Sequence, residues 1–164
     1  MDLIVTPGGL ARWGGWTMRC ALGRGVVRAK REGDGCTPVG RWPMRRVMVR
    51  RDRLGAPATW LPVAPIGRNH LWCDDPGHAR YNRPVRAPFP ASTEALWRDD
   101  GVYDLIVVLG HNDAPPRRGH GSAVFLHVAT PGYSATAGCV ALARRDLLRV
   151  LRGARPGDAV TVLA

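Results

Sequence analysis

The chain has 164 residues, of which 45% are hydrophobic and 23% charged, and this fits one globular domain with a core of its own. We therefore expect a single domain over residues 1–164. Its 20 glycines and 14 prolines are many for a helical protein, because both residues break helix interiors and favour turns. The composition thus favours a β-rich fold.

The net charge of +11 indicates either attraction to an anionic polymer or a solvated basic surface. Lys30 is the only lysine among the 24 basic residues, and the arginines are scattered along the chain in small groups. An arm that binds nucleic acid would be a denser basic block, and a base-stacking platform would have aromatic residues between the basic ones. We therefore expect no nucleic-acid partner.

The four cysteines form no CxxC pair and no zinc-finger cluster with histidine, so we expect no structural metal. Cys20 and Cys36 are able to pair in an oxidising compartment, but buried free thiols are the commoner case. No apolar run approaches membrane-spanning length, and the N-terminus lacks the charged and apolar regions of an export signal. We therefore expect no membrane span, and no export signal is visible.

In chain order, short apolar or alternating runs predict strands at Leu3–Val5, Trp16–Leu22, Arg46–Arg50, Tyr103–Leu109, Ala123–Val128 and Ala159–Leu163. Clusters of turn-forming residues between these runs predict loops at Glu32–Gly35, Asp74–Gly77 and Asn112–Gly121.

Two short helices are also expected. Ser92 is a suitable N-cap for a helix from about Thr93 to Arg98. The apolar residues within Leu147–Leu151 have one-face spacing on a second helix, which Gly153 would close. The expected fold is mainly β (β-rich α+β), a barrel or sandwich with short helices.

The segment Gly119–Leu142 carries the most informative chemistry. An apolar strand in it ends at His127, and a loop of small and polar residues then leads to Gly138 and Cys139 ahead of the second helix. At such a loop-to-helix junction, backbone N–H groups and the helix N-terminus would favour the thiolate and lower the thiol pKa. Gly138 allows close approach of the backbone, so we expect an oxyanion hole of N–H groups there.

His127 is the predicted base, because a strand end would hold it rigidly and the 12-residue separation from Cys139 lets the loop fold back. Each residue also has an ordinary explanation, since free cysteines are usually buried and inert and a histidine in an apolar strand is commonly a core residue. Spacing and composition leave both explanations open.

These residues resemble the motifs of the YkuD-type L,D-transpeptidases, in which a strand-borne histidine is followed by a loop and Ser/Thr-x-Gly-Cys. The matching pieces are Phe125-Leu126-His127 and Thr136-Ala137-Gly138-Cys139, and Thr37-Pro38-Val39-Gly40 is similar to the family's Thr-Pro-x-Gly turn. The resemblance covers roughly the whole chain as one catalytic domain and points to a divergent subgroup.

The resemblance implies cysteine-dependent acyl transfer on peptidoglycan stem peptides. The Cys139 thiolate would attack the L-centre carbonyl of a donor peptide, and the side-chain amine of an acceptor diaminopimelate would resolve the resulting thioester as a crosslink. His127, oriented by a backbone carbonyl, would move the proton. The resemblance also implies no metal or cofactor, a periplasmic or cell-envelope location, and acylation by carbapenems. Whether diaminopimelate or L-alanine is joined to diaminopimelate stays open.

The chain departs from the family pattern at two positions near the thiol. Ala137 stands where the family usually has histidine, and Ala141 stands where it often has arginine or asparagine. Recognition of the substrate carboxylate must therefore come from other residues, and the many arginines are candidates.

His120 is a rival base, because the loop from His127 to Cys139 is shorter than is usual in the family. His120-Gly121-Ser122 resembles the family's His-Gly-Thr and lies 19 residues before Cys139. We prefer His127 because it is borne by the strand. Thr136, Asn112 and Tyr81 are further candidates for the substrate cleft, although asparagine is often a turn former and tyrosine a core residue.

Two other functions stay open. In an L,D-carboxypeptidase, water would resolve the same thioester, so stem peptides would be shortened rather than joined. A non-enzymatic basic protein would bind an anionic polymer in a salt-dependent way that is indifferent to Cys139→Ala.

Overall fold

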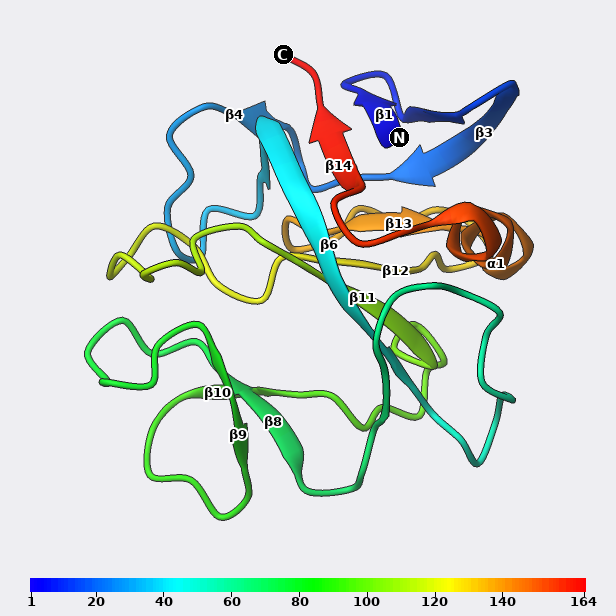
Figure 1. Cartoon of the computed structure of the whole chain (residues 1–164). Helices are drawn as coiled ribbons and strands as arrows, with labels where there is room; N and C mark the ends of the chain where they lie inside the picture. Colours follow the sequence, from blue (N-terminus) through cyan, green and yellow to red (C-terminus); the bar gives the residue numbers. More distant parts are fainter.

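Most strands belong to one sheet that closes on itself, as the computed structural model of residues 1–164 shows (Figure 1). The strand order is β11-β12-β13-β3-β2-β1-β14-β6-β7, and an additional β11–β6 pairing joins the sheet into a barrel. The nine strands are β1 (Asp2–Thr6), β2 (Leu10–Trp13), β3 (Trp16–Ala21), β6 (Gly40–Val49), β7 (Val63–Pro65), β11 (Leu105–Leu109), β12 (Phe125–Val128), β13 (Val140–Leu142) and β14 (Ala159–Val162). The expected mainly β fold is confirmed.

Strand β6 closes the barrel because it is long enough to pair with different strands at its two ends. Its first residues, Gly40–Pro43, pair antiparallel with β14, and Met44–Val49 pair antiparallel with β11. The register with β11 shifts between Val108 and Leu109, which is the irregularity expected where a strand bends around a barrel. Figure 1 shows β6, in cyan, crossing the middle of the molecule between these neighbours.

The two faces of β12 and β13 have different surroundings, because side chains alternate across a strand. The alternate residues Leu126, Val128, Val140 and Leu142 belong to the main core, a cluster of 25 buried residues. Phe125 and Cys139 point the other way, into a second cluster of 10 buried residues that includes Trp72 and Tyr103. One face of this strand pair therefore stabilises the barrel, and the other is available for a site.

The only helix, α1 (Arg144–Gly153), follows β13 and packs one face against the barrel. Its buried residues include Leu147, Val150 and Leu151, which confirms the predicted second helix and its end at Gly153. Ala143 stands at the N-cap without a side-chain cap, and the Ala154 N–H closes the last turn on the carbonyls of Val150 and Leu151. No helix in the structure has the length and apolar composition to cross a membrane.

The predicted helix from Thr93 to Arg98 is wrong. Thr93–Ala95 form strand β10, which pairs antiparallel with β8 (His70–Cys73) in a three-stranded sheet completed by β9 (Arg83–Arg86). So short a segment cannot support a helix from its own hydrogen bonds, and pairing with β8 replaces them. This small sheet lies at the end of the molecule away from the chain termini (Figure 1).

The other expectations on the elements are met in outline. All six predicted strands exist, and their ends differ from the prediction by at most two residues, except that β6 begins at Gly40 instead of Arg46. The three predicted loops lie outside helices and strands. Two short strands, β4 (Val26–Val27) and β5 (Thr37–Pro38), pair in parallel, so the Thr37-Pro38 turn is itself part of a small sheet. The four cysteines are free and buried.

Candidate active site

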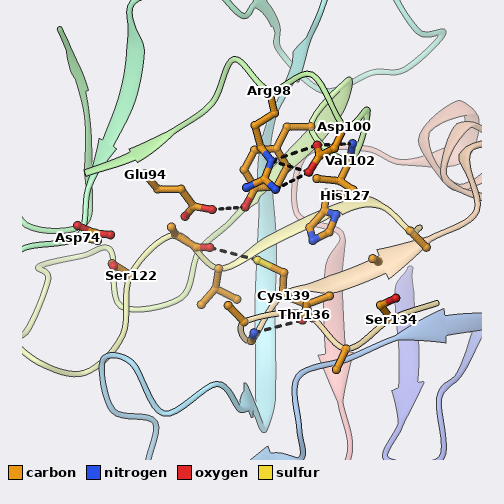
Figure 2. Close-up of a pocket in the computed structure, with 18 of the residues that line it drawn as sticks. Asp74, Glu94, Arg98, Asp100, Val102, Ser122, His127, Ser134, Thr136 and Cys139 are labelled. Atoms are coloured by element: carbon orange, nitrogen blue, oxygen red, sulfur yellow. Dashed lines mark hydrogen bonds and ion pairs between the residues drawn. The ribbon is translucent and has the colours of Figure 1, made fainter. Parts of the chain in front are cut away.

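A pocket of about 520 Å³ opens between the small sheet and the face of the β12–β13 pair that carries His127 and Cys139. Its lining includes both proposed catalytic residues, Cys139 and His127, and charged residues from distant parts of the chain. Figure 2 shows the Cys139 and His127 side chains pointing into this pocket, with Glu94 and Asp74 farther along it. Lys30 also lines the pocket, so residues more than a hundred positions apart in the sequence, Lys30 and Cys139, contribute to the same lining.

The parallel pairing of β12 and β13 brings Cys139 and His127 together. His127 lies directly opposite Ala141, and Leu126 lies opposite Val140. Cys139 is two residues before Ala141 and therefore projects from the same face, one step of about 6.6 Å along the neighbouring strand. The short loop is thus sufficient to place the two side chains on the same face of neighbouring strands and in the lining of one pocket.

Cys139 does not lie at a helix N-terminus, and this corrects the expected cause of its activation. It immediately precedes β13, and α1 begins only at Arg144. The residue is 6% exposed, its thiol donates to the Ala123 carbonyl at 3.3 Å, and the Phe125 N–H donates to Sγ at 3.3 Å. Burial raises the pKa of the Cys139 thiol to about 12, and the nearby Glu94 adds to the rise. The expected lowered pKa is therefore wrong, and the resting thiol is neutral.

His127 is also neutral at ordinary pH. Burial lowers the pKa of His127 to about 4, although its contact with the Val128 carbonyl works in the opposite direction. Nδ1 lies 2.9 Å from that carbonyl oxygen. A carbonyl only accepts hydrogen bonds, so Nδ1 carries the hydrogen and Nε2 is the nitrogen with a free lone pair. The ring is thus held by a backbone carbonyl in the tautomer that a base requires.

Tyr103 and Glu94 are site residues that sequence reasoning missed. The Tyr103 ring packs edge-on against the His127 ring, with centroids 5.2 Å apart, and its hydroxyl donates to Glu94. Burial raises the pKa of Glu94, and the Tyr103 hydrogen bond partly offsets this. Both residues line the pocket. Tyr103 falls at the start of an apolar run and Glu94 falls in the mispredicted helix, so neither carried a signal of its own.

The turn before Cys139 is held by Thr136. Its hydroxyl donates to the Cys139 carbonyl at 2.7 Å and accepts the Gly138 N–H at 3.1 Å. Because the Gly138 N–H already donates to Thr136, the Cys139 N–H is the remaining candidate in this turn to donate to an oxyanion. Thr136 lines the pocket, but its polar atom organises the turn.

The remaining sequence-based candidates lie outside the pocket. Asn112 closes its own loop, with Nδ2 donating to the carbonyls of Arg117 and Gly121 at 2.9 Å. The Tyr81 hydroxyl donates to Glu32 and accepts the Gly121 N–H. Tyr81 therefore holds a lining residue, Glu32, without lining the pocket itself. His120 is exposed and is not among the lining residues, so the structure does not bring it to Cys139.

Two polar atoms in the pocket wall have no partner. Asp74 Oδ1 and Ser122 Oγ are buried without a hydrogen bond, and both residues line the cavity. Such atoms are costly to leave unpaired, so they are suited to contacts with a polar ligand. No three histidine, cysteine or acidic side chains lie close enough together to hold a metal ion.

Comparison with protein families gives one match. The family model of the YkuD L,D-transpeptidase catalytic domain matches residues 6–162, nearly the whole chain and all of the pocket described above. Comparisons with curated proteins and with solved structures gave no match.

Proposed function

The chain belongs to the family of YkuD L,D-transpeptidase catalytic domains, and we propose on this premise that it is a peptidoglycan L,D-transpeptidase acting through Cys139. The observation that carries the proposal is the placement of Cys139 and His127 on one face of neighbouring strands, inside one pocket. The reaction would take place in the cell envelope, where its stem-peptide substrates lie.

The first half-reaction acylates the thiol. Sγ of Cys139 attacks the L-centre carbonyl of the donor stem peptide while Nε2 of His127 takes the thiol proton. The tetrahedral intermediate then collapses, the peptide C–N bond breaks, and the proton passes from His127 to the leaving amine. A thioester on Cys139 and a free D-amino acid, or the peptide that begins with it, are the products.

The second half-reaction resolves the thioester. The side-chain amine of an acceptor diaminopimelate attacks the thioester carbonyl, and His127 takes a proton from that amine. The C–S bond breaks and the proton returns to Cys139, so the free thiol is restored and a crosslink is formed. The two half-reactions balance without a cofactor. In the first, His127 carries a proton from the thiol to the leaving amine, and in the second it carries one from the acceptor amine to the thiol.

Both groups begin neutral, and this determines how the thiol is activated. With a thiol pKa near 12 and an imidazole pKa near 4, a standing thiolate–imidazolium pair is disfavoured. Proton transfer to His127 therefore accompanies attack on the carbonyl, as in a serine–histidine pair. The thiol must also turn from the Ala123 carbonyl toward His127 at that moment.

Intact mass after exposure to a carbapenem tests the proposed nucleophile. We expect the wild-type protein to gain one inhibitor mass and Cys139→Ala to gain none, while far-ultraviolet circular dichroism of the two proteins stays the same. Cys73→Ala is the matched control, because Cys73 is a buried thiol outside the pocket. Acylation of Cys139→Ala would refute the proposal.

Incubation with purified disaccharide tetrapeptide muropeptides then tests the reaction. Crosslinked dimers in the product support transfer, whereas shortened monomers alone would replace the proposal with a hydrolase that lets water resolve the thioester. Salt-dependent binding to peptidoglycan with no product at all, equally strong in Cys139→Ala, would instead support the non-enzymatic binding protein.

A further inference from the structure

Lys30 is the only lysine of a chain that otherwise uses arginine for positive charge. It is buried, with a side chain 6% exposed, and it lines the pocket beside Cys139. A charged side chain is rarely buried to this extent without a partner or a function.

Two glycines make room for this side chain. A Cβ on Gly121 would lie 2.7 Å from Cγ of Lys30, and a Cβ on Gly138 would lie 3.1 Å from Nζ. The lysine stem therefore runs between Gly121 and Gly138, and its ammonium group lies against the turn that presents Cys139. Arginine carries a broad planar guanidinium that differs in shape from the compact ammonium, which accounts for a lysine at this position in an arginine-rich chain.

The ammonium group is held in place from one side only. It forms an ion pair with Asp34, whose carboxylate also accepts the backbone N–H groups of Arg31 at 2.8 Å and Cys36 at 2.9 Å. Burial alone would raise the pKa of Asp34, but these hydrogen bonds lower it, so the carboxylate stays charged. Asp34 is the single hydrogen-bond partner of Nζ, and an ammonium has three N–H donors.

The other cation in the pocket wall is already engaged. Arg98 is bound to Asp100 through both Nε and an outer nitrogen, and its guanidinium also lies 5.1 Å from the centre of the Tyr103 ring. His127 is neutral at ordinary pH. Arg98 keeps unused N–H donors on its other outer nitrogen, but its side chain is 40% exposed, whereas that of Lys30 is 6% exposed. Lys30 is thus the buried positively charged group of the pocket, and it lies against the turn that presents Cys139.

We propose that Lys30 binds a carboxylate of the donor peptide and so selects donors that carry it. The inference rests on the proposed function, because a stem peptide is a ligand with carboxylates on both sides of the reacting carbonyl. One is the C-terminal carboxylate of the D-amino acid that leaves, and the other is the side-chain carboxylate of diaminopimelate. Ala141, the residue opposite His127, offers no polar group that competes for this role.

The test compares three synthetic donor tetrapeptides with the wild-type protein and with Lys30→Met. One donor is the free acid, one has a C-terminal amide, and one has the diaminopimelate side-chain carboxyl amidated. The measured quantity is the second-order rate constant for thioester formation at Cys139. A charged hydrogen bond of this kind corresponds to about a 10- to 100-fold effect, expected mainly in KM.

We expect the wild-type protein to lose about 10- to 100-fold with one amidated donor and Lys30→Met to treat that donor and the free acid alike. The donor that loses rate identifies the carboxylate. Equal rates for all three donors in the wild-type protein, or undiminished discrimination in Lys30→Met, would overturn the inference and leave the proposed function standing. No acylation of the wild-type protein by any donor would overturn the proposed function and this inference with it.

Two further variants guard against a folding defect. Lys30→Met leaves the half-buried Asp34 carboxylate without its ion-pair partner. If this variant fails to fold, the double variant Lys30→Met/Asp34→Asn, which removes both charges, replaces it in the test. Asp34→Asn alone keeps the ammonium group and is expected to keep the discrimination between donors. Loss of discrimination in Asp34→Asn as well would count against a specific role for Lys30.

Discussion

The backbone N–H of Phe125 donates a hydrogen bond to Sγ of Cys139, 3.3 Å away, and so joins the thiol directly to the strand that carries His127. Because Phe125 and His127 are two residues apart on β12, one strand positions both the sulfur and the proposed base. The same N–H lowers the pKa of the thiol, but burial outweighs it. The strand thus fixes the position of the sulfur, but burial at that position keeps the thiol neutral in the resting protein.

Replacing His127 and His120 one at a time shows which of the two is the base. We expect His127→Ala to slow carbapenem acylation of Cys139 by about 10²- to 10⁴-fold, the usual contribution of a general base. His120→Ala should acylate at the wild-type rate, because His120 is exposed and outside the pocket. Time-resolved intact mass measures both. Full-speed acylation of His127→Ala would remove His127 from the mechanism.

The pH dependence of acylation reports the proton acceptor. His127 is the acceptor only when neutral, and its pKa near 4 keeps it neutral at all higher pH values at which the protein is handled. The rate should therefore fall as the pH drops toward about 4 and should be level across the neutral range, with no inflection near about 6.5, the ordinary histidine value. A tenfold rise per pH unit through the neutral range would instead indicate attack by a thiolate formed without His127.

Six of the nine barrel strands were predictable because their side chains carry a periodic signal, whereas the short strands β2, β7 and β13 were not predicted. β11 and β12 are apolar runs bounded by turn-forming residues, and the leucines and valines of α1 repeat at helical spacing. β8 and β10 were missed because they are three or four residues long and mix apolar with polar side chains. The capping pattern at Ser92 then favoured a helix, and only the pairing of β10 with β8 overrides it.

The sequence predicted which two side chains, the proposed nucleophile and the proposed base, would share one pocket, but not the electrostatics of that pocket. Cys139 and His127 follow from motif and spacing, because the parallel pair β12–β13 preserves their sequence relationship in space. The direction of the Cys139 pKa shift does not follow, since it depends on burial and on Glu94, which arrives from the small sheet. The sequence also did not predict that Lys30 and Tyr103 lie in the pocket with Cys139, because only tertiary contacts bring them there.

The hydroxyl of Thr136 should matter more than its size. Thr136→Val keeps the shape of the side chain but removes the bonds to the Gly138 N–H and the Cys139 carbonyl. We expect a loss of about 1–3 kcal/mol in the free energy of unfolding, together with slower acylation, and near-complete rescue in Thr136→Ser. Urea unfolding and intact mass measure the two effects. Wild-type acylation in the valine variant would show that this turn does not position the thiol.

Gly138 is the position in the loop where a side chain is least tolerated. Its φ of 129° is rarely adopted by other residues, and a Cβ there would lie 2.7 Å from the Cys36 carbonyl oxygen. Gly138→Ala should therefore lower the free energy of unfolding by about 1–3 kcal/mol, since the backbone must shift to relieve the contact. The shift would also move Cys139 relative to His127, so acylation should slow by more than the loss of folded protein explains.

Gly132→Ala is the matched control in the same loop. Nothing lies within 4 Å of a Cβ on Gly132, so its replacement should change the free energy of unfolding by no more than about 0.5 kcal/mol and leave acylation unchanged. Denaturant midpoints and acylation rates of the two variants, measured side by side, check the comparison. Equal behaviour of the two alanine variants would mean that the turn at Gly138 adapts freely, and the close packing of Lys30, Gly138 and Cys36 would then not be what holds Cys139 in the pocket.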